Sequence, residues 1–315
     1  MKIVLLDAAT LGDDLDLAPL SKYGEVVPYP STEPENVEKR ISGADVVIVN
    51  KVKLNESTVG GNSSLRLICI AATGFDNVDL EFMKRKGIGV CNVVGYSTDS
   101  VAQLTVSMVL SLATHLPEYN AYVESGKYSR GSVANKLTPV YHEIAGKTWG
   151  IVGLGNIGKK VAAVAEAFGC RVIANKRTPV EGYECVDIDT LCKTADIITV
   201  HTPLNEGTLG LISEERIAMM KRDAIVVNVA RGAVCDEAAL CRAAKEGKLC
   251  GIGVDVYSAE PFRESSPYFE VKELPNVCLT PHMAWGSYEA RNRCLRDMMA
   301  SIDAFLAGEK RSRLV

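Results

Sequence analysis

Short apolar runs alternate along the chain with segments whose apolar residues recur at helical spacing. In the first part of the chain the runs have the length of buried strands, and we predict strands at Ile3–Leu6, Val26–Val27, Val46–Val49 and Leu67–Ile70. Helical patterns separate these runs, and we predict helices at Leu15–Tyr23, Pro34–Ser42 and Leu80–Lys86. Strand–helix alternation is typical of βαβ units, so an α/β fold with a parallel sheet is expected.

One long helical pattern, from about Ser97 to Ser125, interrupts this alternation and is followed by the polar stretch Gly126–Gly146. Its uncharged part is long enough to raise the question of a membrane span. Polar side chains such as Gln103 and His115 lie within it, however, so we expect a helix buried between domains and no membrane partner.

The alternation then resumes. We predict strands at Thr148–Val152, Arg171–Ala174, Ile197–Val200, Ala224–Val229, Gly251–Val256 and Val277–Thr280, and helices at Asn156–Phe168 and Gly286–Leu306. We therefore expect two α/β domains, one of residues 1–97 plus 287–315 and one of residues 98–286. Open parallel sheets bind ligands beyond the carboxyl ends of their strands, so an interdomain cleft is expected there.

Composition narrows the function classes. The chain has 315 residues, a net charge of −4 and ten cysteines, none in a C-x-x-C pair. The acidic balance argues against nucleic acid as a partner. With only four histidines, we predict no metal site, and the sparse cysteines favour free thiols in a reducing cytoplasm.

Three glycines mark a phosphate-binding turn. Gly153, Gly155 and Gly158 fit G-x-G-x-x-G between a predicted strand and a predicted helix. The first glycine allows the tight turn, the second lets the backbone approach a pyrophosphate, and the third brings helix and strand together. The free N–H groups of the helix favour an anion. We predict a dinucleotide site, which makes residues 98–286 a Rossmann domain.

The following strand offers no acid for the ribose. NAD sites usually place Asp or Glu about twenty residues beyond the glycines. Here Lys176, 18 residues beyond Gly158, is followed by Arg177. Two cations at this point would neutralise a 2′-phosphate, which favours NADP over NAD. The alternative is that both are solvated loop charges.

Three predicted strands are each followed by a chemically active residue: Arg231, Glu260 and His282. Parallel strands bring these groups to one edge of the sheet, beside the expected cofactor. Arginine grips a carboxylate or carbonyl oxygen, histidine passes a proton, and a carboxylate beside it favours the imidazolium form. The set suits reduction of a 2-oxo acid, although each residue alone is weak support.

At this point the sequence resembles the D-isomer-specific 2-hydroxyacid dehydrogenase family. The resemblance rests on Ala72–Asp79, on the glycine turn, and on the segments Asn228–Gly232, Gly253–Glu260 and Thr280–His282. It implies two flavodoxin/Rossmann-like domains with a cleft between them, and a homodimer. It also implies that Arg231 binds substrate, that Glu260 partners His282, and that His282 is the acid/base.

The resemblance further implies a set of binding residues. Thr73 and Gly74 would contact the substrate carboxylate. The cofactor would be lined by the glycine turn together with Asn156, Ile157, Lys176, Arg177, Thr202, Val229, Ala230, Asp255 and Thr105.

Within the family, the segments Cys91–Thr98 and His282–Trp285 are similar to the glycerate dehydrogenase/hydroxypyruvate reductase branch. We therefore predict reduction of a small 2-oxo acid such as hydroxypyruvate or glyoxylate. Lys51 fits that branch and could meet a substrate anion; a solvated lysine is the equal alternative. Two other functions stay open on the same scaffold: a nucleotide-sensing, corepressor-like interaction protein, and a phosphite dehydrogenase.

Overall fold

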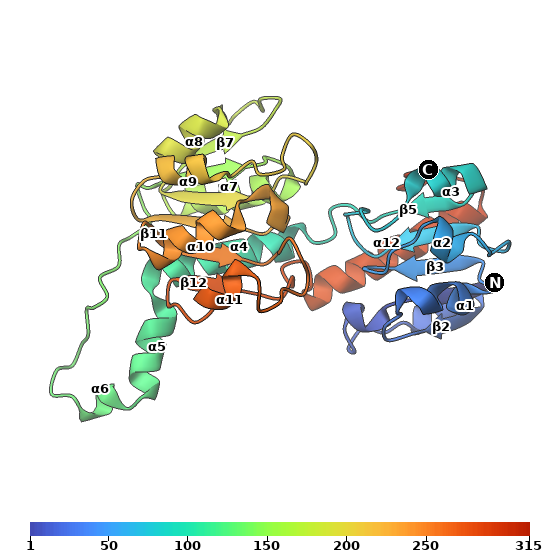
Figure 1. Cartoon of the computed structure of the whole chain (residues 1–315), viewed down its shortest axis with the longest axis horizontal. Coiled ribbons are helices and arrows are strands. Elements are labelled where there is room, and N and C mark those ends of the chain that lie inside the picture. Colours follow the sequence, from blue (N-terminus) through green and yellow to red (C-terminus); the bar gives the residue numbers. More distant parts are fainter. The chain divides into compact units, whose positions relative to one another are not determined.

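The chain forms two compact units, each built around a parallel sheet (Figure 1). The computed structural model describes all 315 residues, Met1–Val315. Unit 1 consists of Met1–Ser97 together with Trp285–Val315, and unit 2 consists of Thr98–Ala284. The predicted class, two parallel-sheet α/β domains, is confirmed.

Unit 1 has a five-stranded sheet in the order β2-β1-β3-β4-β5. Its strands are β1 (Lys2–Leu5), β2 (Glu25–Pro28), β3 (Val46–Val49), β4 (Leu67–Ile70) and β5 (Gly89–Cys91). All pair in parallel, which is the flavodoxin-like arrangement. The central strands β3 and β4 are buried at every position because both faces of the sheet are covered.

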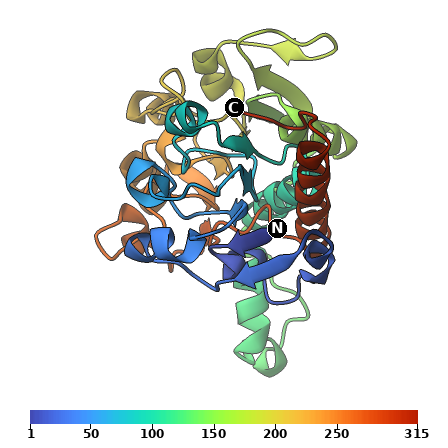
Figure 2. The ribbon, with the colours of Figure 1, turned by 90° about the vertical axis from the view of Figure 1, so that its right-hand side faces the viewer.

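Helices cover the two faces of this sheet (Figure 2). One face packs against α1 (Val37–Ile41), α2 (Glu56–Val59) and α3 (Leu80–Lys86), and the other against α12 (Tyr288–Leu306). Short 3₁₀ turns lie at Ala8–Leu11, Ala18–Tyr23 and Pro34–Asn36. The C-terminal Leu314 pairs with the edge strand β5 through its N–H to Val90 O. The C-terminal segment Trp285–Val315 thus completes the unit that Met1–Ser97 begins.

Unit 2 has a seven-stranded sheet in the order β12-β11-β10-β9-β6-β7-β8. Its strands are β6 (Thr148–Val152), β7 (Arg171–Asn175), β8 (Glu184–Cys185), β9 (Ile197–Val200), β10 (Ala224–Asn228), β11 (Leu249–Val254) and β12 (Val277–Leu279). Counted from β6, this is the Rossmann order 3-2-1-4-5-6 with one strand added. The strand order reverses between β6 and β9, and ligands of such sheets bind at that point.

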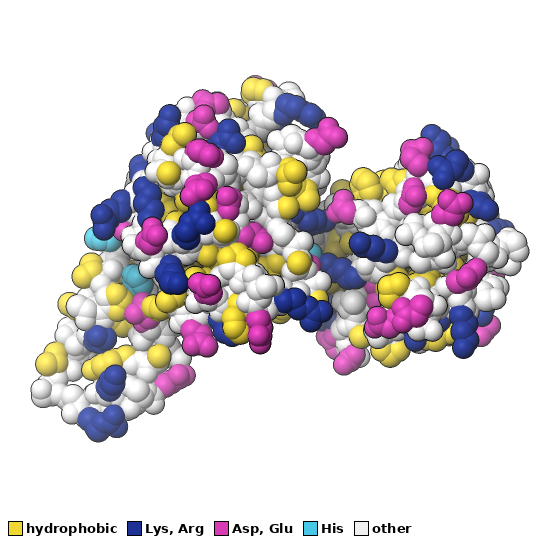
Figure 3. All heavy atoms as spheres, viewed as in Figure 1, with side chains coloured by type: hydrophobic (Ala, Val, Ile, Leu, Met, Phe, Trp, Pro, Cys, Tyr) yellow, Lys and Arg dark blue, Asp and Glu magenta, His cyan; other side chains and the backbone are white.

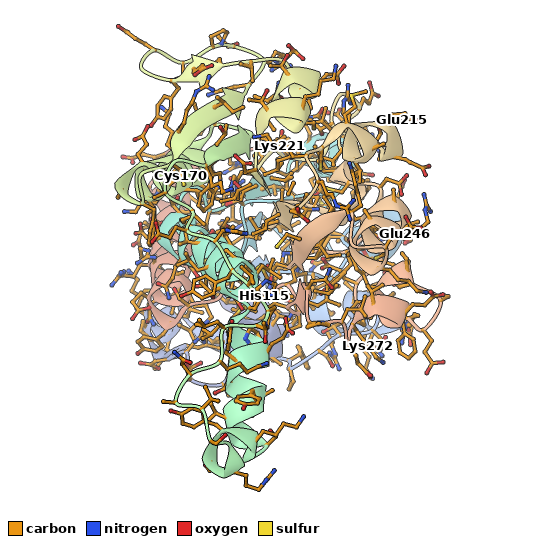
Figure 4. The ribbon with its side chains drawn as sticks, turned by 90° about the vertical axis from the view of Figure 1, so that its left-hand side faces the viewer. His115, Cys170, Glu215, Lys221, Glu246 and Lys272 are labelled. Atoms are coloured by element: carbon orange, nitrogen blue, oxygen red, sulfur yellow. The ribbon has the colours of Figure 1, made fainter.

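The helices of unit 2 also lie on both faces of the sheet. They are α4 (Thr98–Thr114), α5 (Leu116–Glu124), α6 (Lys127–Arg130), α7 (Asn156–Ala167), α8 (Ile188–Thr194), α9 (Glu214–Met219), α10 (Glu237–Lys245) and α11 (Pro267–Val271), with a 3₁₀ turn at Gly232–Val234. α4 and α7 pack together on one face, and α8 to α11 contribute to the core on the other. α5 and α6 project from the body of unit 2 and bury no side chain (Figures 1 and 4).

Two predicted helices differ from those observed. The helix predicted at Leu15–Tyr23 is only a 3₁₀ turn that begins at Ala18, with Pro19 in its first turn. The long helix predicted from Ser97 to Ser125 ends at Thr114, because His115 adopts a left-handed conformation (φ 51°) and a new helix, α5, begins at Leu116 with Pro117 in its first turn (Figure 4). A periodic apolar pattern continues through both breaks, which is why the pattern alone missed them.

Two further corrections concern short elements. The predicted helix Pro34–Ser42 is divided into a 3₁₀ turn and the short α1. The polar stretch Gly126–Gly146, for which no element was predicted, contains the short α6. No helix of the chain combines the length and the apolar character that crossing a bilayer requires.

Candidate functional site

The parallel neighbours β10, β11 and β12 end at the same edge of the unit 2 sheet. Arg231 follows β10, Glu260 follows β11 and His282 follows β12. The three predicted catalytic residues therefore stand on adjacent loops. The three residues follow three strands that are consecutive in the sequence, and these strands are also neighbours in the sheet.

Glu260 and His282 form a direct pair. His282 Nδ1 lies 2.6 Å from Glu260 Oε2, and the Tyr257 N–H donates to Oε1 of the same carboxylate at 3.0 Å. The two side chains are 30% and 21% exposed, so the pair is shielded and still reachable from solvent. With Nδ1 engaged by a carboxylate, Nε2 is the nitrogen that can exchange a proton with a substrate.

A buried carboxylate holds the turn that carries His282. Asp255 is 1% exposed and accepts from the Thr280 hydroxyl at 2.6 Å, from Met283 N at 2.8 Å and from Ala284 N at 3.0 Å. His282 itself has a left-handed backbone with φ 52°, a conformation that needs such support. Burial raises the pKa of Asp255, against the lowering effect of these hydrogen bonds.

Tyr257 ties the same loops from the other side, and sequence reasoning missed it. Its hydroxyl donates to Thr280 O at 2.8 Å, and its ring packs edge-on against Phe262 and Tyr268. Burial raises the pKa of Tyr257 above its ordinary range, so the phenol remains a neutral donor. The sequence did hold a signal for Tyr257, because it lies within the segment Gly253–Glu260, one of those that carry the family resemblance.

The loop that carries Arg231 is braced by Asn228. The Asn228 amide donates to Arg231 O at 2.9 Å, and its oxygen accepts from Ala230 N at 3.0 Å. Arg231 Nη1 donates to Ala230 O at 2.8 Å, which holds the guanidinium close to its own loop. Val229 and Ala230, both predicted to line the cofactor, thus lie in the braced turn between β10 and Arg231.

The glycine turn has the shape that a dinucleotide requires. Gly153 has φ 97°, and a Cβ on it would lie 2.6 Å from Thr202 N, the predicted contact after β9. A Cβ on Gly158 would collide with Gly153 O. A Cβ on Gly155 would meet no protein atom within 4 Å, so the second glycine faces open space, as a bound pyrophosphate needs.

The N-terminus of α7 completes the cradle. Gly155 is its N-cap and supplies no side chain to the free N–H groups, and Asn156 and Ile157 are its first residues. The first turn contains no acid, so its partial positive charge is available to an anion. The residues present fit a dinucleotide.

Lys176 and Arg177 follow β7 as exposed residues. Lys176 Nζ donates to Leu154 O at 3.1 Å, so its ammonium group bridges from the end of β7 to the glycine turn. Thr105 differs from the rest of the predicted set: it is fully buried in α4 and its hydroxyl donates to Val101 O at 2.7 Å. Its assignment to the cofactor stays a prediction.

His201, at the end of β9, was not singled out by the sequence. Its Nε2 lies 3.0 Å from the Thr199 hydroxyl, which accepts from Trp149 Nε1 at 3.1 Å. Its Nδ1 is buried without a hydrogen-bond partner. Desolvation lowers the pKa of His201 to about 3, so this imidazole is neutral in the folded protein.

The predicted substrate contacts Thr73, Gly74 and Lys51 belong to unit 1, where they follow β4 and β3. Thr73 is fixed at both ends: its hydroxyl donates to Val93 O at 2.8 Å, and Asn92 Nδ2 donates to Thr73 O at 2.7 Å.

The Lys51 turn is pinned by a buried acid. Asp7 accepts from the backbone N–H groups of Asn50, Lys51 and Val52 at 2.5 to 3.2 Å. Both predicted substrate loops of unit 1 are therefore rigidly built.

The chain is similar to known proteins along most of its length. Residues 106–284 match the model of the D-isomer specific 2-hydroxyacid dehydrogenase NAD binding domain. A glycerate dehydrogenase of Methylorubrum extorquens is 36% identical over 309 residues, 98% of this chain and 97% of that protein. A hydroxypyruvate reductase of Blautia hydrogenotrophica is 34% identical over 317 residues and covers 98% of each chain. The structure of an acyclic imino acid reductase (Bsp5) in complex with NADPH and D-Arg superposes with a TM-score of 0.88, at 29% identity over both whole chains.

Proposed function

The chain belongs to the D-isomer-specific 2-hydroxyacid dehydrogenase family, and from that premise we propose that it reduces a small 2-oxo acid, hydroxypyruvate or glyoxylate. Membership makes it an oxidoreductase that uses a nicotinamide cofactor and acts on 2-hydroxy acids. The observation that carries the proposal is the 2.6 Å distance between His282 Nδ1 and Glu260 Oε2. The loop that carries Glu260 lies next to the loop that carries Arg231.

In the proposed reaction, His282 moves the proton. The imidazolium form is stabilised by Glu260 at Nδ1, and Nε2 donates to the carbonyl oxygen of the substrate as that oxygen becomes a hydroxyl. A reduced nicotinamide bound at the glycine turn would supply the hydride for the carbonyl carbon. Arg231 binds the oxygens of the substrate and stabilises the negative charge that develops on the carbonyl oxygen.

We assign the substrate carboxylate to Thr73 and Gly74. Their loop is held by the Thr73 hydroxyl and by Asn92, so it would offer N–H groups in a fixed position. Lys51 would meet a second polar or anionic group, and its turn is fixed by Asp7. The rigid construction of both loops supports these roles, because substrate orientation is worth more when the binding groups do not move.

We propose NADP as the preferred cofactor. The segment after β7 carries Lys176 and Arg177 where an NAD enzyme places an acid, and Lys176 already reaches the glycine turn. An ammonium and a guanidinium at this position would neutralise a 2′-phosphate. The imino acid reductase of similar structure is a complex with NADPH.

We also propose a homodimer. The segment 116–146 carries large apolar side chains at the surface, and Figure 3 shows hydrophobic side chains over α5 and α6. Among them Leu137 is 72% exposed and Val133 66% exposed. Apolar surface of this extent marks an interaction site more often than free surface.

All ten cysteines are free thiols, which supports a reducing compartment such as the cytoplasm.

The decisive experiment follows absorbance at 340 nm with a panel of 2-oxo acids, NADH and NADPH. Turnover of hydroxypyruvate or glyoxylate is the expected result. Cofactor binding without turnover of any acid would instead favour a nucleotide-sensing protein. Oxidation of phosphite with added NAD⁺ or NADP⁺, seen as a rise in absorbance at 340 nm, would favour a phosphite dehydrogenase.

A further inference from the structure

Glu237 has a contact that its place at the start of a helix does not require. It is the first residue of α10, and the preceding Asp236 already caps that helix by accepting from Ala239 N at 2.9 Å. The Glu237 side chain leaves its own helix, and Oε1 accepts from Ser258 N at 2.8 Å. Glu237 therefore links the segment after β10 to the loop after β11.

The same peptide is contacted by the loop of Arg231. A Cβ on Gly232 would collide with the carbonyl carbon of Tyr257 and with Ser258 N, and would lie 2.7 Å from Glu237 Oε1. Gly232 thus packs its backbone directly against the peptide that Glu237 holds. Any shift of the Tyr257–Ser258 peptide moves it toward Gly232 or away from it, and Gly232 is the residue next to Arg231.

From this peptide the contacts continue to the imidazole. Tyr257 N donates to Glu260 Oε1 at 3.0 Å, and Glu260 Oε2 lies 2.6 Å from His282 Nδ1. The conformation of the turn from Tyr257 to Glu260 therefore sets where the Glu260 carboxylate stands. Glu237, which belongs to α10 and not to this turn, fixes the turn through its hydrogen bond with Ser258 N.

Satisfaction of a buried donor does not explain the contact. Ser258 is exposed, so water could accept from its N–H if Glu237 were absent. A charge-assisted bond from a helix residue adds a fixed position, which water does not. The contribution of Glu237 is geometric.

We propose that Glu237 is a positioning residue for the reaction. Through Ser258 it fixes the turn that carries Glu260, and through Gly232 it couples that turn to the loop that carries Arg231. This proposal rests on the proposed function, because it concerns the same site.

The test compares Glu237→Ala, which removes the acceptor, with Glu237→Gln, which keeps an oxygen in place. Glu246→Ala, at the exposed far end of α10 (Figure 4), is the matched control. For Glu237→Ala we expect kcat to fall roughly ten- to a hundredfold, since a 1 Å misplacement can cost about 10²-fold. The cofactor Kd of Glu237→Ala should stay at the wild-type value. Glu237→Gln should recover most of the wild-type kcat, and Glu246→Ala should match the wild type in both quantities.

Two readouts are independent of turnover. Amide hydrogen exchange should rise at Tyr257–Glu260 in Glu237→Ala, and the NMR signal of the His282 imidazole, assigned by its loss in His282→Ala, should change its chemical shift at fixed pH. A variant with a lower Tm but an unchanged kcat and an unchanged His282 imidazole signal would make Glu237 merely structural and overturn the proposal. If the wild type reduces no 2-oxo acid, the proposed function fails, while amide exchange and the His282 imidazole signal still decide whether Glu237 positions the turn.

Discussion

His282 Nδ1 lies 2.6 Å from Glu260 Oε2, and the other oxygen of that carboxylate accepts from Tyr257 N. Both oxygens of Glu260 are therefore engaged in hydrogen bonds. The imidazole is held by its Nδ1 side, so Nε2 is the nitrogen proposed to exchange a proton with the substrate.

His282→Ala removes the proposed proton donor. We expect kcat for reduction of the preferred 2-oxo acid to fall about 10²–10⁴-fold, the usual contribution of a positioned acid. Cofactor binding, followed by nicotinamide fluorescence, should stay near the wild-type Kd. A loss of kcat smaller than about tenfold would remove His282 from the acid role.

Lys176→Asp reverses the charge proposed to meet the 2′-phosphate. We expect kcat/KM with NADPH to fall roughly ten- to a hundredfold, the worth of one charge-assisted contact, with little loss for NADH. Lys272→Asp, the same charge change on the exposed end of α11 (Figure 4), is the control. A wild-type enzyme that clearly prefers NADH would refute the cofactor assignment before any variant is made.

Two glycines of one turn should respond differently to alanine. Gly155→Ala places its methyl group in open space at an ordinary φ of −89°, so the protein should fold normally while its cofactor Kd rises about tenfold or more. Gly158→Ala drives its methyl group into Gly153 O, so it should lower stability by about 1–3 kcal/mol. Urea unfolding and cofactor titration of both variants check this contrast. Equal loss of stability in both would contradict the open space over Gly155.

His201 should give unit 2 an acid-sensitive stability. Desolvation lowers its pKa to about 3 in the folded protein, against about 6.5 in an unfolded chain. Between these values the unfolded state binds one proton more, so the stabilisation present above about pH 6.5 is lost as the pH falls toward about 3, at up to about 1.4 kcal/mol per pH unit. His201→Asn should flatten that slope.

Unfolding of unit 2 can be followed through the fully buried Trp149 in a Trp285→Phe background. The exposed His142 provides the control, and His142→Asn should keep the wild-type slope. An unchanged slope in His201→Asn would mean that His201 is solvated or protonated in the folded state.

Most strands could be predicted because buried parallel strands are continuous apolar runs. Val46–Val49, Leu67–Ile70 and Ile197–Val200 were predicted with the bounds observed. The break at His115 was missed because the apolar spacing continues through it, although Pro117 in the first turn of α5 was a sequence signal that the long helix ends there. Periodicity reports which face is buried and is silent on single dihedral angles.

The candidate site shows the same division. Arg231, Glu260 and His282 were visible because each follows its strand directly, and the sheet brings strand ends together. The contact of Glu237 with Ser258 was not visible, because it depends on a side chain leaving its helix toward a loop 21 residues away. Contacts between loops are set by packing, which no local pattern encodes.

The order of the chain has a consequence for biosynthesis. Strands β1 to β5 are translated first, but α12, which covers one face of their sheet with Leu295, Met298 and Ile302, follows only after all of Thr98–Ala284. A ribosome therefore holds a sheet with one apolar face covered only in part, by residues of the N-terminal 3₁₀ turns such as Leu11 and Leu20, while the whole of unit 2 is being made. That face is the kind of surface that chaperones shield and that aggregates when left alone. Nascent chains released before Tyr288 should consequently depend on chaperones far more than the full-length protein.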